Sequence, residues 1–187
     1  MGFLSREQLE TLGFSELGSN VFISDKASFY NPTKISVGSH VRIDDFCVLS
    51  AGEGGIKIGD YVHIAVFSSL IGSGRIKLSD FVNISSRVSI YSSNDDYSGT
   101  SMSNPMVPRE FKNVQSANVE LHKHVIVGSG SVVLPGVTLN EGVAIGALSL
   151  VVKDCEAFTV FSGVPAKPLK PRKKDLKLLE IKFRESR

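Results

Sequence analysis

Aliphatic residues recur along this chain at intervals of six. The step is regular within five groups of three positions, and a long gap separates the third group from the fourth. The fifteen positions are Val37, Ile43, Leu49, Ile58, Ile64, Leu70, Leu78, Ile84, Ile90, Leu121, Val127, Val133, Leu139, Ile145 and Val151. Side chains alternate every two residues in a strand and every 3.6 in a helix, so a period of six fits neither alone. It fits a short strand followed by a sharp corner, repeated three times per turn.

A small or β-branched residue stands four positions after most of these aliphatics. The positions are Val41, Cys47, Val62, Ser68, Val82, Val88, Val125, Ser131, Val137, Val143 and Ser149. We expect both series to point into a triangular coil of about 18 residues and to stack on their equivalents in the next coil. Backbone groups then pair with the coils above and below, so only the terminal coils keep open edges. The pattern therefore predicts an all-β protein, a parallel β-helix.

The spacing between coils marks the interruptions. Val37 to Ile58 is 21 residues, and the excess falls in a glycine-rich corner at 51–55. Leu78 to Leu121 is 43 residues, about 25 more than a regular coil needs. We therefore expect an inserted loop at 92–118, rich in Asn, Asp, Ser and Pro. Loops of this length in compact domains are usually functional or disordered.

Short helices are predicted at both ends. Ser5 and Gln8 form a capping box for a helix over 5–12, which would cover the open first coil. A second helix, over 175–183, carries its apolar residues on one face. The expected organisation is an N-terminal helical cap at 1–18, a β-helix at 19–165 and a basic, helical tail at 166–187.

Composition and charge exclude several classes of protein. The formal net charge of +2 is too small to indicate nucleic-acid binding. Basic residues gather near the C-terminus, either as a solvated helix face or as a phosphate-binding patch. Cys47 and Cys155 form no CxxC motif, which predicts buried thiols in a reducing cytoplasm. Because the chain has no signal core and no run of eighteen apolar residues, we expect no membrane insertion.

The closing part of the chain resembles the hexapeptide-repeat acyltransferases. The segment VIVGSGSVVLPGVTLNEGVAIGALSLVVKD, followed by SGVPAKPLK, is similar to the last coils of galactoside, maltose and sugar-nucleotide acetyltransferases. LGF…LGSNVFIS and SSNDDYSG…NPMVP look closer to a subgroup that acetylates nucleotide-linked amino sugars for surface polysaccharides such as O-antigen or capsule. The resemblance implies left-handed coils, against the usual crossover preference. It also implies a homotrimer, acetyl-CoA bound between neighbouring subunits, and no metal.

The resemblance also directs attention to the start of the loop. O-acetyltransferases of this family carry a histidine there, soon after an I-Y-x-x strand. In IYSSNDDYS the matching position is Asp95. A carboxylate is a weak base unless it is desolvated, but a neutral sugar amine needs less assistance than a hydroxyl. We therefore predict N-acylation, with Asp95 as orienting group or base. The alternative is that Asp95 and Asp96 only cap the turn.

His63 is the second candidate base. It ends a repeat, IGDYVH, and would sit beside a corner, where it could face the groove between subunits. Its alternative is a plain surface position. His40, His122 and His124 are expected to be corner residues, the last two exposed to solvent.

Coenzyme binding is predicted on the closing coils. Small residues there would let pantetheine approach the backbone, although the corners need glycines in any case. The resemblance places basic residues near the coenzyme phosphates. A backbone N–H of Ala147 or Gly128 is a candidate oxyanion donor. The predicted coenzyme-binding residues are Gly128, Ser129, Gly146, Ala147, Lys153, Lys167 and Lys170.

Other functions stay open at this point. One is an O-acetyltransferase acting on a free sugar or a polysaccharide unit, and another is a non-catalytic β-helix binding protein. A γ-type carbonic anhydrase would need three histidine ligands at spacings that His63, His122 and His124 do not reproduce. The sugar, the nucleotide and the acyl length are not determined by the sequence.

Overall fold

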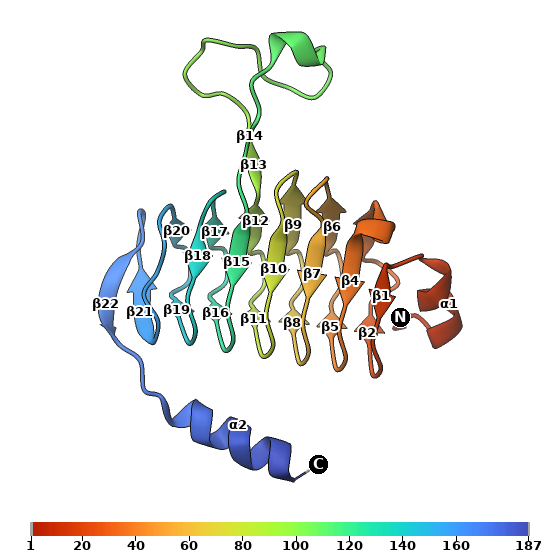
Figure 1. The fold of residues 1–187 in the computed structure, drawn as a ribbon, viewed down its shortest axis with the longest axis vertical. Coiled ribbons are helices and arrows are strands. Elements are labelled where there is room, and N and C mark those ends of the chain that lie inside the picture. The colour runs from red at the N-terminus through yellow and green to blue at the C-terminus, as the bar shows by residue number, and fades with distance from the viewer. Residues whose placement is uncertain (1, 187) are drawn as a thin grey trace.

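The body of the molecule is a left-handed parallel β-helix (Figure 1). The computed structural model describes residues 2–186. Three sheets form the faces of a triangular prism, and the chain passes from the first sheet to the second, to the third and back again. We call the edges of the prism the first corner (first to second sheet), the second corner (second to third) and the third corner (third to first).

Strands of the three sheets are short, as the six-residue period requires. The first sheet contains β1 (Glu16–Leu17), β4 (Ile35–Val37), β7 (Ile56–Ile58), β10 (Ile76–Leu78), β15 (Val119–Leu121) and β18 (Thr138–Leu139). The second contains β2 (Phe22–Ile23), β5 (Arg42–Ile43), β8 (His63–Ile64), β11 (Asn83–Ile84), β16 (Ile126–Val127), β19 (Ala144–Ile145), β21 (Thr159–Ser162) and β22 (Lys167–Pro171). The third contains β3 (Ser28–Tyr30), β6 (Val48–Ala51), β9 (Ser69–Gly72), β12 (Ser89–Tyr91), β17 (Val132–Val133) and β20 (Leu150–Val151).

The core follows the predicted pattern. All fifteen repeated aliphatics are buried, and the most exposed of them, Ile145, is only 3% exposed. The eleven small or β-branched residues that follow them are buried as well. Strand register stacks like positions on one another, as in the column Leu49, Leu70, Ile90. The prediction of a parallel β-helix is therefore confirmed.

Corner residues adopt a backbone conformation that the sequence pattern does not reveal. At the first corner, His40, Tyr61, Phe81 and His124 have φ values of 57–61°. The left-handed region costs a residue with a side chain about 1–2 kcal/mol. Here the rings form a ladder, with centroids 4.5–5.0 Å apart and nearly parallel planes. Aromatic pairs stabilise by about 0.5–1.5 kcal/mol beyond burial, which offsets much of that cost.

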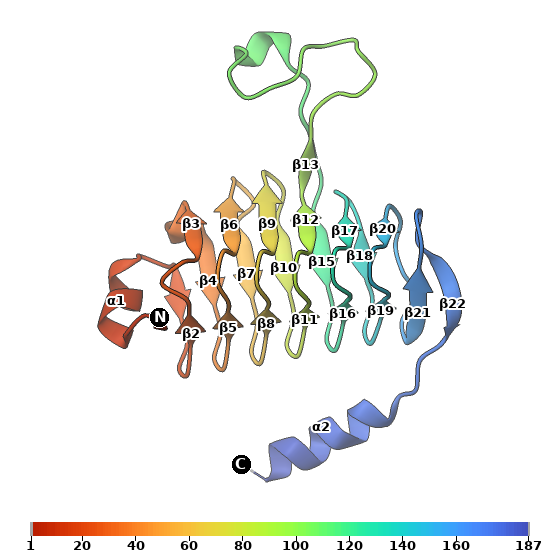
Figure 2. The ribbon, with the colours of Figure 1, turned by 180° about the vertical axis from the view of Figure 1, so that it is seen from behind.

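The N-terminal helix and the inserted loop both lie where they were predicted. Helix α1 (Arg6–Thr11) begins with the expected capping box: Gln8 N donates to Ser5 Oγ at 3.2 Å, and Ser5 N donates to Gln8 Oε1 at 2.8 Å. The loop projects from the third corner on an antiparallel hairpin (Figures 1 and 2). Its elements are β13 (Ser93–Asn94), the 3₁₀ turn η2 (Arg109–Phe111) and β14 (Gln115–Ser116), and another 3₁₀ turn, η1 (Pro32–Lys34), precedes β4.

The C-terminal segment folds back along the prism. Strand β22 pairs antiparallel with β21, and helix α2 (Asp175–Glu185) then runs beneath the first corner (Figure 1). Phe183 packs edge-on against Tyr61, with ring centroids 5.2 Å apart. Glu180 accepts hydrogen bonds from Lys123 Nζ at 2.8 Å and His124 Nε2 at 2.6 Å. The prediction that His124 is exposed is therefore wrong: the helix covers its side chain, which is 11% exposed.

Docking of α2 should depend on pH through Glu180. Burial alone would raise the pKa of Glu180, but hydrogen bonds from Lys123, His124 and Arg184 lower it from 4.5 to about 2. A lowered folded-state pKa means that the stabilisation is present above pH 4.5 and is lost as the pH falls through about 2. We therefore expect α2 to detach within that window.

This detachment can be followed by fluorescence. The chain has no tryptophan, so Phe183→Trp supplies a single reporter in the helix interface. We expect its emission to shift to the red as acid is added, and to be shifted already at neutral pH when Glu180→Gln is combined with it. Glu185→Gln, an exposed carboxylate on the same helix, is the matched control. Equal emission from both double variants would contradict a role for Glu180.

Both cysteines are buried and unpaired, as predicted. Burial raises the pKa of Cys47 to about 11 and that of Cys155 to about 12, the charge of Asp154 adding to the latter. Neither thiol is therefore ionised near neutral pH. No helix between residues 2 and 186 is long and apolar enough to cross a membrane. No group of three or more His, Cys, Asp or Glu in that range is arranged to hold a metal ion.

Candidate active site

Asp95 stands at the base of the inserted loop, directly after β13. Its side chain is exposed. Among residues 2–186 no group donates a hydrogen bond to its carboxylate or forms an ion pair with it. The position leaves both carboxylate oxygens available to a ligand.

The carboxylate of the neighbouring Asp96, by contrast, accepts several hydrogen bonds from the loop. It accepts hydrogen bonds from Ser98 N at 2.8 Å, from Ser101 N and Oγ at 2.9 and 2.8 Å, and from Thr100 Oγ1 at 3.0 Å. The hydrogen bonds, those of Ser98 foremost, hold the pKa of Asp96 far below its usual range. The turn-capping alternative therefore describes Asp96, whereas Asp95 is not used by the turn.

His63 lies on the outer surface of the second sheet, in β8, and both of its ring nitrogens have partners. Its Nε2 is 2.8 Å from Asp44 Oδ2, and its Nδ1 is 3.2 Å from Asn83 Oδ1. Asp44 also accepts a hydrogen bond from Arg42 Nε at 2.7 Å. Burial would raise the pKa of Asp44, but His63 and Arg42 together lower it.

These contacts bear on whether His63 can serve as a base. Asp44 Oδ2 can only accept, so Nε2 donates a hydrogen bond to it, and the other ring nitrogen, Nδ1, faces the side-chain amide of Asn83. These contacts fix the ring of His63, whose side chain is 42% exposed on the outer face of the second sheet. Sequence reasoning missed Asp44 and Asn83, although a signal existed: Asn83 follows His63 by 20 residues, one coil, and pairs with it in register.

Four of the predicted coenzyme residues come together at the second corner. Gly128 and Ser129 lie in one coil, and Gly146 and Ala147 in the next. Gly128 N donates to the Ile145 carbonyl at 2.8 Å, so it is not available as an oxyanion donor. The Ala147 N–H has no hydrogen-bond acceptor within residues 2–186. It is thus the one of the two proposed donors that a ligand could engage.

Glycine at 128 is required by the fold itself. A Cβ at this position would lie 2.5 Å from Ala147 N in the next coil. Close stacking of coils therefore explains this glycine without a ligand.

The three predicted lysines are scattered. In the antiparallel β21–β22 pair, Lys167 lies opposite Ser162. The Oγ of Ser162 is 2.8 Å from the position that a Cβ on Gly146 would occupy. Lys170 pairs with Val160, nearer the first corner, and Lys153 follows β20 towards the third corner. Only Lys167 is therefore close to the four small residues.

Asp95 and the small residues lie on different edges of one prism. Asp95 follows the third sheet at the third corner, whereas Gly128 and Ala147 lie at the second corner. The strands of the third sheet separate these two edges (Figure 2). A single chain therefore does not bring the candidate acid–base group to the candidate coenzyme groove.

Comparison with known proteins gives strong similarities over the full chain. The chain is 61% identical over 186 residues to a dTDP-4-amino-4,6-dideoxy-D-glucose acyltransferase from Escherichia coli, spanning 100% of this chain and 97% of that protein. It is 35% identical over 167 residues to WbbJ of Escherichia coli strain K12, assigned as a lipopolysaccharide biosynthesis O-acetyl transferase, spanning 85% and 80%. No protein-family profile matches the chain.

A solved structure is also similar over the full chain. AntD, an N-acyltransferase from Bacillus cereus, superposes with a TM-score of 0.95 at 44% identity, covering 100% of this chain and 99% of that one. That structure contains dTDP-4-amino-4,6-dideoxyglucose and coenzyme A. Its solved variants replace one aspartate or, ten positions earlier, one serine.

Proposed function

This chain belongs to the hexapeptide-repeat acyltransferases that act on dTDP-linked amino sugars, and we propose that it acylates the 4-amino group of a dTDP-4-amino-4,6-dideoxyhexose. The acyl donor is an acyl-coenzyme A thioester, and acetyl-CoA is the donor we test first. The chain is thus an acyl-CoA-dependent acyltransferase.

The observation that carries N-acylation is the unpartnered carboxylate of Asp95 at the base of the loop. A sugar hydroxyl needs a base strong enough to remove its proton during attack. An amine needs only to be neutral and correctly oriented, because its lone pair attacks directly. A carboxylate can orient the amine by accepting one N–H hydrogen bond. His63, whose ring is held between Asp44 and Asn83 on the outer face of the second sheet, is not needed for this role.

We propose the following step. The amine nitrogen attacks the thioester carbon while Asp95 holds the amine, and the Ala147 N–H donates to the developing oxyanion. The carbon–nitrogen bond forms and the carbon–sulfur bond breaks. The proton lost by nitrogen passes, through Asp95, to the departing sulfur. One amide and one thiol result, so atoms and charge balance without a metal.

Ser85 is a further candidate for this site. In the similar enzyme AntD, the substituted aspartate and serine are ten positions apart, and Ser85 precedes Asp95 by the same interval. Ser85 N donates to the Val127 carbonyl at 3.0 Å. It therefore stands in the coil beside Gly128, on the coenzyme side of the proposed site.

We also propose that the enzyme works as a homotrimer with its site between chains. Asp95 and Ala147 belong to different corners of the prism, so a second chain has to bring the two together. The exposed Tyr97 and Met106 of the loop, 91% and 88% accessible, are apolar surface for such a contact. We further propose that Lys167 contacts the coenzyme phosphates. We also propose that the chain divides into a cap at 1–18, a β-helix at 19–165 and a tail at 166–187.

The product suits the assembly of a surface polysaccharide, such as a lipopolysaccharide O-antigen. An amide at C4 converts a charged sugar into a neutral one before it is joined to a chain. Nucleotide sugars and acyl-CoA are cytoplasmic metabolites, and two unpaired cysteines suit a reducing compartment. We therefore propose the cytoplasm as the site of the reaction.

The test is thiol release from acetyl-CoA with matched acceptors. We expect release with dTDP-4-amino-4,6-dideoxyglucose and at least a hundredfold less with the dTDP sugar that carries a hydroxyl at C4, because the protein supplies no strong base. Mass spectrometry of the nucleotide sugar should show one added acyl group. Preference for the hydroxyl sugar would overturn N-acylation in favour of O-acylation.

A further inference from the structure

The C-terminal segment concentrates positive charge. Residues 167–187 contain nine Lys or Arg and three Asp or Glu, a net charge of +6, although the whole chain carries only +2. The other residues contain 12 basic and 16 acidic side chains and therefore carry −4. Such an asymmetry orients a protein in the field of a charged partner. The segment suits a partner that is acidic over an extended area.

Several cations of this segment are not neutralised by the protein itself. Lys177 does form an ion pair, with Glu141 at 3.5 Å. Other side chains are exposed and have no hydrogen bond or ion pair among residues 2–186; they include Lys170, Lys173 and Lys182. The charge of these three lysines is therefore available to a partner.

Helix α2 also presents apolar side chains to solvent. Glu180 and Phe183 face the first corner. Leu178 and Ile181 lie on the opposite side of the helix and are 63% and 53% exposed. They are three residues apart, and Lys182 follows Leu178 by one turn, so the three side chains are neighbours. We define the tail surface as the exposed side chains of Lys170, Lys173, Leu178, Ile181 and Lys182.

The combination of charges and aliphatic groups indicates the kind of partner. Anionic lipid head groups attract lysines, and the aliphatic side chains of a helix that lies on a membrane enter the boundary between head groups and acyl chains. Nucleic acid would attract the lysines but offers no apolar layer for Leu178 and Ile181. A basic helix with outward aliphatic residues is therefore typical of a membrane-surface contact.

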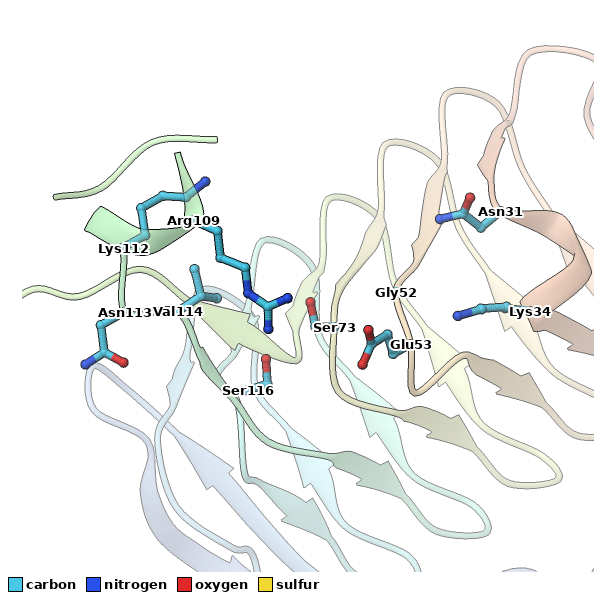
Figure 3. A pocket seen from close by; sticks show the side chains of 10 residues that line it. All are labelled: Asn31, Lys34, Gly52, Glu53, Ser73, Arg109, Lys112, Asn113, Val114 and Ser116. Carbon is cyan, nitrogen blue, oxygen red and sulfur yellow. The ribbon is translucent and has the colours of Figure 1, made fainter. Parts of the chain in front are cut away.

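The position of α2 is compatible with a flat partner. The helix lies outside the prism, beneath the first corner and on the side away from the inserted loop (Figures 1 and 2). Another group of basic side chains, on Lys34, Arg109 and Lys112, instead lines a cavity between the loop and the N-terminal coils (Figure 3). A bilayer cannot enter that cavity, whereas it can contact the projecting helix.

We propose that the tail surface docks the protein on a membrane that contains anionic lipids, with α2 parallel to the membrane plane. The lysines supply the attraction, and Leu178 and Ile181 enter the head-group layer. The contact is peripheral, because α2 contains 11 residues and is about 16 Å long, about half the thickness of the hydrocarbon core. Docking is independent of the proposed reaction, since no residue of the tail surface belongs to the proposed active site.

Sedimentation of the full chain with lipid vesicles tests this docking. Vesicles of phosphatidylglycerol and phosphatidylethanolamine in equal parts supply the anionic surface, and vesicles of phosphatidylcholine are the neutral reference. We expect binding to the anionic vesicles and at least about tenfold weaker binding to the neutral ones. Binding should also be lost as the ionic strength is raised from about 0.05 to about 0.5 M.

Two pairs of substitutions identify the lysines that matter. Lys173→Gln combined with Lys182→Gln should weaken binding to anionic vesicles about tenfold, because each lysine close to the surface adds attraction. Lys57→Gln combined with Lys77→Gln is the matched control, since it removes the same charge from β7 and β10 of the first sheet. The control should bind as the wild type does.

Tryptophan fluorescence shows which surface meets the lipid. The chain has no tryptophan, so Ile181→Trp supplies a single reporter on the outward side of α2. Its emission should shift to the blue when anionic vesicles are added. Phe111→Trp is the control, because Phe111 is 54% exposed on the loop at the opposite side of the prism (Figure 1). Its emission should not change.

Three results would overturn the proposal. One is no binding of the wild type to anionic vesicles, and another is equal binding by the two lysine pairs. The third is binding that leaves the emission of Ile181→Trp unchanged, because another surface then makes the contact.

A second copy of the chain is the other candidate occupant of this helix face. Leu178→Gln combined with Ile181→Gln should keep the molecular mass of the lipid-free protein, measured by sedimentation velocity, and weaken vesicle binding about tenfold. A smaller assembly in this variant would assign the face to a second copy and overturn membrane docking. Acylation activity decides neither outcome, so the proposed reaction and the docking can fail separately.

Discussion

Replacing Asp95 by asparagine should lower kcat by about a hundredfold or more, since a group that accepts a proton in the transition state contributes about 10²–10⁴-fold. Asparagine keeps the size of the side chain and can still accept a hydrogen bond through its carbonyl oxygen, but it cannot take up a proton. We therefore expect the loss to appear in kcat. The affinity for coenzyme A, measured by titration, should be unchanged because that ligand is expected at another corner.

Asp96→Asn is the matched control, with the same change of charge one residue away. Asp96 accepts hydrogen bonds from Ser98, Thr100 and Ser101, so its substitution should loosen the loop. We expect a raised acceptor KM and a smaller effect on kcat. If the two variants lose kcat equally, loop order rather than chemistry at Asp95 explains the loss.

Mixed assemblies extend the same test to the proposed site between chains. Ala147→Trp should block the coenzyme side and leave Asp95 intact, whereas Asp95→Asn does the reverse. Each variant alone should be nearly inactive. Refolding the two together should recover part of the activity, because some sites then combine an intact Asp95 from one chain with an intact Ala147 from another. No recovery in a mixed trimer would place both residues in one chain's site.

Leu70→Ala should reduce the free energy of unfolding by about 2–5 kcal/mol, the usual cost of removing most of a fully buried leucine side chain. Leu70 is completely buried and stacks in register between Leu49 and Ile90. Coils contact only their neighbours along the prism, so a cavity in a central coil weakens both of its interfaces. Few nearby groups can move to fill the space, because each is fixed by the strand register.

Urea unfolding at one fixed protein concentration measures this effect. Ser69→Ala is the control: Ser69 is adjacent in β9 but faces outward, where its Oγ bonds to Ser89 Oγ at 3.2 Å. We expect the control to change the unfolding free energy by no more than about 0.5 kcal/mol. A Leu70→Ala protein as stable as the Ser69→Ala protein would contradict the stacked-core interpretation.

The sequence by itself determined the coils and their core. A period of six can only be satisfied by short strands joined at corners, so the fifteen aliphatics had to point inward, and all of them do. The same counting located the inserted loop, since 43 residues between Leu78 and Leu121 exceed any regular coil. The Ser5–Gln8 capping box was equally local, because both partners lie within one helical turn.

Tertiary structure decided which outward residues meet. Coils of 20 or 21 residues bring the side chains of Asp44, His63 and Asn83 together on the outer surface. The six-residue period describes only the positions that point inward, so it does not predict contacts between side chains that point outward. Whether Asp95 or Asp96 caps the turn depended on where Ser98 and Ser101 lie after the loop folds. The burial of His124 required α2 to return along the first corner. Each of these outcomes depends on distances between segments far apart in the chain, which local pattern does not encode.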